Sequence, residues 1–471
     1  MKPDRIRSFV PVAILLIATS LRVGGLCKFA LNNDEIAELT WAQQSWSAMM
    51  QSVSNDRVHP PLDYIVQHCM DSISIECLRR IPAVLAGIAT VALIMHIALR
   101  AFGWGAGKAA GFLLSLSPAH IRYSQEIRPY AIGLFALTAA ISALLEYRHT
   151  SQRRWAVLWF VSLLTAAYTL YFAALVAVIT SAALIFFERK DRLNNLWRHM
   201  PQLVAAALIL YLPWMRVVIA AIRQPPFAAR DQLNAAWFSY RLQVLGTGDW
   251  QVEPISIGSY ILWTLAAAGC FIAWRSAAGR SLVFWLVGGF AAEILILQVH
   301  PHLSAVRHLL PAWLAVFPLA GAAIAAISRW RAAPIGVLIC AVIAAADART
   351  LRAYYDHGRP DWREAANFVA SRIRRNERIF AGNGRADLNF GYYWRQAGTL
   401  FPLERLPTNV QLTLTGPAWI VTAGCLMDDV ARASLDHQEL RFARPYTNHC
   451  QIHYLRSGTT IALPHGVCSA E

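Results

Sequence analysis

Residues 10–27 read VPVAILLIATSLRVGGLC, an apolar segment whose one charged residue is Arg22. About 20 consecutive apolar residues in a helix cross the hydrocarbon core of a bilayer, so this segment predicts a membrane-spanning helix near the start of the chain. Similar segments recur to residue 348, and the whole chain is 56% hydrophobic and 15% charged. Soluble domains carry roughly 25% charged residues. The sequence therefore predicts a mainly α, polytopic membrane protein.

The hydropathy pattern predicts about eleven spans of roughly 17 to 22 residues. Their expected extents are 9–27, 80–100, 107–121, 129–147, 154–169, 170–187, 201–221, 257–274, 281–299, 308–327 and 333–348. The fifth and sixth meet almost without a loop, so a count of ten or twelve also fits the pattern. Residues 1–350 form the expected transmembrane module, with a first outer loop at 28–79.

Alternate loops between these spans are basic, which predicts the orientation. Excess Lys and Arg marks cytoplasmic loops, and the loops that contain Arg100, Arg148 and Arg189 show this excess. The opposite loops and the tail after residue 350 are expected to face the periplasm or exterior across a bacterial inner membrane. Because the loop bias accounts for the net charge of +15, no nucleic-acid partner is expected.

Residues 351–471 have a different pattern, with more charge and shorter apolar runs. WREAANFVASRI at 362–373 has the spacing of an amphipathic helix. Short strands are expected at 378–381, 418–422, 451–455 and 459–463. The tail is therefore predicted to be a small α/β domain outside the cytoplasm.

The chain has eight cysteines, whose pairing the sequence leaves open. Disulfides are allowed on the outer face, where the first outer loop and the tail hold Cys69, Cys77, Cys425, Cys450 and Cys468. Cys27, Cys270 and Cys340 are expected to be packing residues.

The first outer loop carries an acidic pair, Asp34-Glu35, within about ten residues of the first span. Residues 36–50 have roughly helical spacing of apolar side chains, which suits a helix in the membrane interface. His59-Pro60-Pro61-Leu62 then turns the chain into a second short helix. Taken alone, the acidic pair and His59 are equally compatible with ordinary solvated loop residues.

Two further groups of polar residues fall on the outer face. YSQEIRPY, Tyr123 to Tyr130, places Glu126 and Arg128 beside a proline that restricts the backbone; an interfacial ion pair with tyrosine anchors is the alternative reading. The second group is His300, His302, Arg307 and His308. Cations at a membrane surface suit a lipid phosphate. A zinc site at His300 and His302 is left open, although two histidines do not define one.

These elements in this order resemble the GT-C superfamily of integral-membrane glycosyltransferases. The nearest resemblance is to glycosyltransferase family 39, which includes dolichyl-phosphate-mannose protein mannosyltransferase-like enzymes and the lipid A aminoarabinose and galacturonic acid transferases. It covers the first 150 residues in motif and order. Beyond them it depends on the span pattern, on RHLLP at 307–311 and on DWR at 361–363.

The resemblance implies transfer of a sugar from a polyprenyl-phosphate donor to a lipid, glycan or protein acceptor at the outer face, with inversion of the anomeric centre. It implies Asp34 as the general base and Glu35 as its neighbour. His59, Arg128 and Arg307 would bind the donor phosphate. Glu126, Tyr123 and Tyr130 would bind substrate, and Glu126 would alternatively orient Arg128. No cofactor is expected to be required, and a divalent metal is left open.

Other classes of protein remain as alternatives. A transporter or flippase of a lipid-linked or anionic substrate would use charges within the spans, for which Arg22, Arg216 and Glu293 are the candidates. A noncatalytic scaffold would not gather ionisable residues on one face. A nucleotide-sugar enzyme is not favoured, because GWGAG at 103–107 lacks the strand and helix context of a phosphate loop.

Overall fold

The computed structural model describes residues 3–188, 190–224, 232–248, 257–301, 305–329, 333–357, 361–382, 384–406, 411–423, 440–441, 450–455 and 460–462. The chain divides into two compact units. The first contains Met1–Leu26, Trp41–Asp249 and Glu253–Leu351; the second contains Cys27–Thr40, Trp250–Val252 and Arg352–Glu471. The sequence predicted a division at residue 350, with the whole first outer loop in the membrane module. In the structure, the part of that loop up to Thr40 belongs instead with the C-terminal residues. Each unit is described by itself below.

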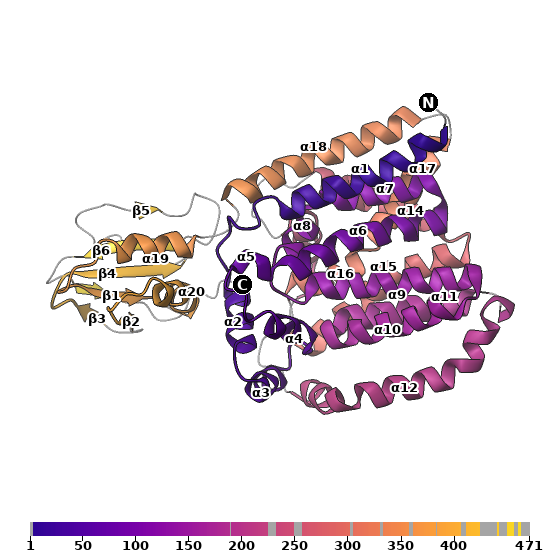
Figure 1. Ribbon diagram of the computed structural model, residues 1–471. Helices are drawn as coiled ribbons and strands as arrows, with labels where there is room; N and C mark the ends of the chain where they lie inside the picture. Colours follow the sequence, from indigo (N-terminus) through magenta and orange to yellow (C-terminus); the bar gives the residue numbers. More distant parts are fainter. Residues whose placement is uncertain are drawn as a thin grey trace. The chain divides into compact units, whose positions relative to one another are not determined.

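The first unit is a bundle of helices that run side by side, with short helices at one end (Figure 1). The short ones are α3 (Trp46–Asp56), α4 (Leu62–Cys69), α5 (Glu76–Arg79) and α8 (Pro118–Ser124). The long ones are α1 (Pro3–Val23), α6 (Ile81–Phe102), α7 (Trp104–Leu116), α9 (Tyr130–Thr150), α10 (Arg153–Thr169), α11 (Tyr171–Phe187), α12 (Lys190–Ile222), α14 (Ile257–Ala273), α15 (Ala277–Val299) and α18 (Ala333–His357). The remainder are α13 (Ala235–Thr247), η2 (Val306–Leu309), α16 (Leu310–Trp313) and α17 (Val316–Ile327).

Every predicted span coincides with a helix or with the broken pair α16–α17, so the mainly helical membrane fold is confirmed. Five described helical segments are long and apolar enough to cross a membrane, in α6, α9, α12, α15 and α18. The bent pair, with an angle of 43°, makes six. Shorter apolar helices lie at Phe9–Val23, Tyr171–Phe187 and Ile257–Ala273. The count of about eleven crossings stays a prediction.

Helix α9 lies at the centre of the bundle, where it packs against α6, α10 and α11. Nearly all its side chains are buried, and most are Ala, Leu or Ile. Helix α17 packs against α7 and α14 through small residues. A Cβ at Gly269 of α14 would lie 2.0 Å from the carbonyl oxygen of Leu319. Such close backbone approach is typical of helix pairs in membranes, where small residues replace a hydrophobic driving force.

Two of the charges within the spans are buried. The Arg22 guanidinium donates to the carbonyl oxygens of Ala18 and Ser115 at 3.0 and 3.2 Å, and lies 2.7 Å from Nδ1 of His120. These contacts offset the cost of burying the guanidinium, and they join α1 to α7 and α8. Glu293 is fully buried in α15, where its carboxyl faces the backbone of Ala312.

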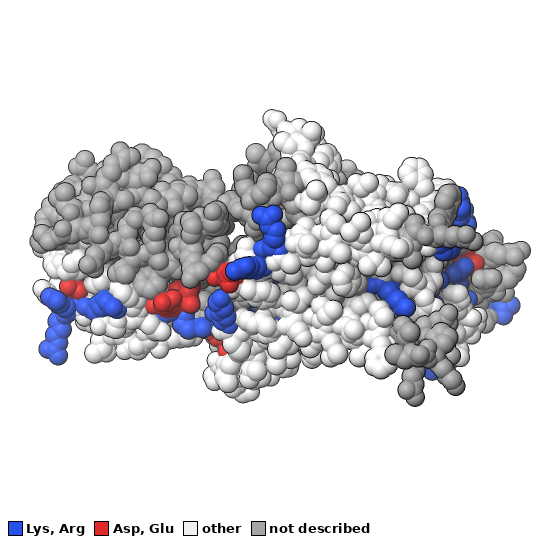
Figure 2. Space-filling view, turned by 90° about the horizontal axis from the view of Figure 1, so that it is seen from above, with Lys and Arg blue, Asp and Glu red and all other residues white. Residues whose placement is uncertain are grey.

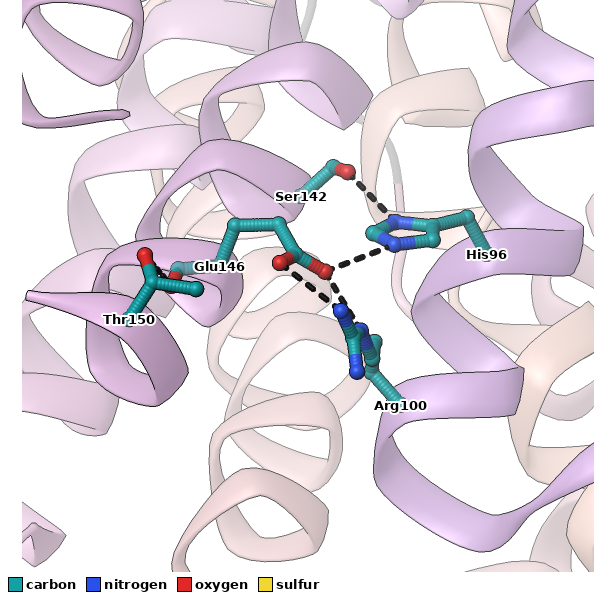
Figure 3. Close-up of polar contacts among 5 residues, drawn as sticks. All are labelled: His96, Arg100, Ser142, Glu146 and Thr150. Carbon is teal, nitrogen blue, oxygen red and sulfur yellow. Dashed lines mark hydrogen bonds and ion pairs between the residues drawn. The ribbon is translucent and has the colours of Figure 1, made fainter. Parts of the chain in front are cut away.

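An ion cluster around the buried Glu146 joins α6 to α9 near the ends of both helices (Figure 3). The Glu146 carboxylate accepts two bonds from Arg100, one of them 2.8 Å from Nη2 to Oε2. Nε2 of His96 lies 2.8 Å from the same carboxylate, and Nδ1 of His96 lies 2.8 Å from the Ser142 hydroxyl. Because a carboxylate in an apolar bundle is costly unless it is paired, this cluster allows Glu146 to lie inside the unit.

The surface of the first unit also reflects the cost of placing a charge in an apolar environment. On the face shown in Figure 2, Lys and Arg are sparse over the middle of the helical unit and are seen more often toward its ends, one of which is the end at which α1 begins in Figure 1. A charge-free middle with basic ends is typical of a membrane protein. The assignment of the basic end to the cytoplasm stays a prediction.

The second unit contains a small sheet covered by helices (Figure 1). Its elements are α2 (Asn33–Ala42), which ends in the first unit, then α19 (Trp362–Ala370), β1 (Arg378–Ala381), α20 (Gly384–Gln396), β2 (Leu403–Arg405), β3 (Gln411–Thr413), β4 (Ala418–Ala423), β5 (Leu440–Arg441), β6 (Cys450–Leu455) and β7 (Thr460–Ala462). The sheet order is β2-β1-β4-β6-β5, with β1 parallel to β2 and β4, while β3 pairs with β7. The predicted α/β tail is confirmed.

One expectation about the cysteines is wrong. Cys27 was expected to be a packing residue, but Cys27 and Cys77 are both disulfide-bonded. The predicted span ran to residue 27, but α1 ends at Val23, so Cys27 lies outside the helix, which explains the difference. Cys69, Cys270 and Cys340 are free.

We expect Glu146→Gln to destabilise the first unit by about 1–2 kcal/mol, because bonds to charged groups contribute more than neutral ones and Arg100 and His96 are partly exposed. The unfolding midpoint of the purified protein in detergent measures this. Ser142→Ala is the matched control, since it removes only a neutral bond to His96. A Glu146→Gln protein that is no less stable than Ser142→Ala would contradict the role of the cluster.

Candidate active site

The chain between α3 and α4 directs His59 into the interior. Helix α3 ends at Asp56, and Arg57 takes a left-handed conformation with φ 62° while its N–H donates to the carbonyl of Val53. Pro60 and Pro61 then lead into α4, whose first residue is Leu62. The two proline φ angles are restricted, so the path of the chain is narrowly determined. As a result the His59 side chain is only 2% exposed.

His59 lies within a set of aromatic and cationic residues from four parts of the first unit. Its ring meets Tyr130 edge to face at 5.7 Å and lies 6.3 Å from the His308 ring. The Arg128 guanidinium lies 5.9 Å from the Tyr130 ring. His308 stacks on Phe172 at 5.2 Å, and Tyr123 contacts Tyr130 at 5.2 Å. We call His59, Tyr123, Arg128, Tyr130, Arg307 and His308 the His59 cluster.

The cluster concentrates positive charge around a neutral imidazole. Burial lowers the pKa of His59 well below its ordinary value, and the nearby Arg128, His308 and Arg307 lower it further. His59 is therefore uncharged at neutral pH, and among the described residues its Nδ1 has no hydrogen-bond partner. Two arginines and an imidazole that can donate a hydrogen bond form a suitable environment for a phosphate.

Glu126 pairs with Arg122 in the structure, whereas the sequence suggested Arg128 as its partner. Its carboxylate accepts from Nε of Arg122 at 3.2 Å, one helical turn away. Arg122 also donates to the carbonyl oxygen of Gly248 at 2.6 Å and lies 5.5 Å from the Tyr123 ring. Sequence reasoning missed Arg122, although a pair of opposite charges four residues apart was a visible signal.

The acidic pair belongs to the second unit, whereas the His59 cluster belongs to the first. Glu35 is fully buried and Asp34 is half-buried. The N–H of Asn32 donates to Oε2 of Glu35 at 3.0 Å, and the N–H of Glu35 donates to Oδ1 of Asn32 at 2.9 Å. This reciprocal arrangement is a capping box at the start of α2. Glu38, one turn after Asp34 and also fully buried, was missed by sequence reasoning.

Residues of the C-terminal part of the second unit hold this segment. The N–H of Leu31 donates to the Tyr393 hydroxyl at 2.8 Å, and the Phe29 and Tyr354 rings lie 5.0 Å apart. The Arg363 guanidinium in turn lies 5.5 Å from the Tyr393 ring. Asp361, the first residue of the DWR motif, accepts from the N–H of Glu364 and caps α19. The DWR motif therefore supports the residues that anchor the chain before Asp34.

The zinc site at His300 and His302 stays a prediction. Among the described residues, no group of three or more His, Cys, Asp and Glu side chains could hold a metal ion. His302, which the sequence paired with His300, lies outside the described residues.

Comparisons with known proteins bear on the family and the fold of this chain. The family model named dolichyl-phosphate-mannose-protein mannosyltransferase matches residues 58–216, which include His59, Glu126 and Arg128. No curated protein matches the chain. The structure of ArnT from Cupriavidus metallidurans bound to undecaprenyl phosphate is similar, with a TM-score of 0.58 and 14% identity over 94% of this chain and 97% of that chain.

A second similar structure is the Archaeoglobus fulgidus oligosaccharyltransferase in complex with Zn and sulfate. Its TM-score is 0.52 at 15% identity, over 82% of this chain and 61% of that chain. Both similarities are at the level of the fold, and the family model covers the segment that contains the His59 motif. The chain therefore has the fold of the GT-C membrane glycosyltransferases, as its motifs predicted.

Proposed function

We propose that this protein is a glycosyltransferase that moves a sugar from a polyprenyl-phosphate donor to an acceptor hydroxyl at the outer face of a bacterial inner membrane. The observation that carries the proposal is the His59 cluster, in which Arg128 and Arg307 surround a buried, uncharged His59. The match to a dolichyl-phosphate-mannose family and the likeness to a structure bound to undecaprenyl phosphate support the same class of donor.

The cluster acts on the leaving group. As the bond between the anomeric carbon and the phosphate oxygen breaks, its electron pair passes to the polyprenyl phosphate, which gains negative charge. Arg128 and Arg307 stabilise that charge, and His59 donates a hydrogen bond to a phosphate oxygen. Tyr123, Glu126 and Tyr130 line the sugar side of the same site. The reaction assigns no step to a metal ion.

Asp34 accepts the proton of the acceptor hydroxyl as its oxygen attacks the anomeric carbon. A single displacement of this kind inverts the anomeric centre. Glu35 has a different role, because its carboxylate closes the capping box with Asn32. We therefore assign Glu35 to positioning: it holds the first turn of α2, from which Asp34 projects.

We expect Asp34→Asn to lower sugar transfer by about 10²–10⁴-fold, the usual contribution of a general base. The readout is mass spectrometry of envelope lipids, glycans and proteins from a deletion strain complemented with each variant. Glu35→Gln is the matched control, because glutamine also closes a capping box, and it should restore the modification. Wild-type turnover by Asp34→Asn would remove the catalytic assignment.

We expect Arg128→Ala to weaken binding of undecaprenyl phosphate by about tenfold or more, the contribution of a bond to a charged group. The dissociation constant of the purified protein in detergent tests this, with protein level and unfolding midpoint checked to be unchanged. Arg154→Ala, at an exposed position in the first turn of α10, is the control. Equal affinities for wild type and Arg128→Ala would show that Arg128 does not bind the phosphate.

Donor binding should depend on pH through the protonation of the His59 imidazole. The pKa of His59 is lowered in the free protein, and a bound phosphate anion raises it, so binding takes up a proton at pH values between the two. The ratio of the wild-type affinity for undecaprenyl phosphate to the affinity of His59→Gln should therefore increase as pH falls below about 6.5. The ratio of the two proteins cancels titration of the phosphate itself. A ratio independent of pH from 5 to 8 would contradict this linkage.

A further inference from the structure

Helix α12 presents an uncovered apolar surface along most of its length. Only 6% of its apolar 18-residue window is buried inside the unit. Its large exposed apolar side chains are Trp197, Val204, Leu208, Ile209, Leu210, Leu212, Ile219 and Ile222. A helix with this composition and exposure faces the hydrocarbon of the bilayer. Its surroundings are therefore lipid chains, up to the C-terminal turns of the helix.

A cleft of about 480 Å³ lies at those C-terminal turns, and it is rich in arginine. Its lining consists of Arg57, Arg216, Ile219, Ala220, Arg223 and Gln224. The α12 residues follow one face of the helix, because positions 216, 219, 220 and 223 are spaced by three, four and seven residues. Arg57 comes from the opposite wall, where its left-handed backbone ends α3.

The three arginines lack partners within the described part of the chain. No described side chain forms a hydrogen bond or ion pair with the guanidinium of Arg57, Arg216 or Arg223. Like charges that share one cleft repel each other, so the arrangement is favourable when an anion lies between them. Gln224 adds a neutral donor to the same wall.

The wall between the arginines is apolar and continues into the lipid-facing surface. Ile219 and Ala220 lie between Arg216 and Arg223 on α12, and Ile219 is 42% exposed. An occupant therefore needs a negatively charged group beside a hydrocarbon chain. The phosphate head group of a membrane lipid has this composition, with the phosphate between the arginines and the acyl chains along α12.

We propose that this cleft is a binding site for an anionic membrane lipid, separate from the His59 cluster. None of the cleft-lining residues belongs to that cluster. The inference does not depend on the proposed transferase activity, because it rests on the cleft, its charges and the exposure of α12.

Binding of dioctanoyl phosphatidic acid to the purified full-length protein in detergent micelles tests the site. sn-Glycerol 3-phosphate carries the phosphate without acyl chains, and dioctanoyl phosphatidylcholine carries the chains without net charge. We expect the phosphatidic acid to bind at least tenfold more tightly than either, and Arg216→Gln and Arg223→Gln each to weaken it about tenfold. Arg216→Lys should retain part of the affinity.

Arg198→Gln is the matched control, because it removes one exposed arginine from the other end of the same helix. Equal loss of affinity in Arg198→Gln would show nonspecific attraction and overturn the site. Equally tight binding of glycerol phosphate would make it a small-anion site, and unchanged affinity in both cleft variants would place the lipid elsewhere. Arg223 is exposed, so Arg223→Gln keeps the test valid if Arg216→Gln fails to fold.

Discussion

The cost of placing a charge in hydrocarbon organises the first unit. Every ionisable side chain within the spans must be paired, hydrogen-bonded or close to an end. Arg22 satisfies this requirement through backbone carbonyls, and Glu146 through Arg100 and His96. Both of these charges lie near the ends of their helices, and so do the residues suited to chemistry. The same constraint therefore both stabilises the bundle and locates its candidate site.

The His59 cluster shows how such a site can discriminate between ligands. Burial and neighbouring cations keep His59 uncharged, so the imidazole does not add a further positive charge to the two arginines in the free protein. An arriving phosphate relieves the repulsion among the cations and favours protonation of the imidazole. A neutral ligand does neither. Under the proposed function, selection of a phosphate would therefore follow from the unfavourable electrostatics of the free state.

Much of this could be predicted from sequence, because hydropathy and alternation are local signals. Helices α6, α9, α10, α11, α14 and α15 and the strands β1, β4, β6 and β7 were expected within a few residues, whereas α12 begins well before its predicted span and α13 was not expected. The cap formed by Asn32 and Glu35, and the Arg122–Glu126 pair, were also readable from spacings of three and four residues, yet they were missed. By contrast, nothing local in the sequence indicates that Cys27–Thr40 belongs with the C-terminal unit. That association depends on contacts between residues such as Leu31 and Tyr393, which are 362 positions apart.

This long-range contact has a consequence for biosynthesis. The segment that leads into α2 is near the start of the chain, but the side chain that receives its Leu31 N–H is made only after the last span of the bundle. A nascent chain therefore inserts its helices while α2 still lacks its support. The segment that carries the acidic pair reaches its final arrangement only after Tyr393 has been made. The protein thus delays one part of its fold until the helices of the bundle have been made.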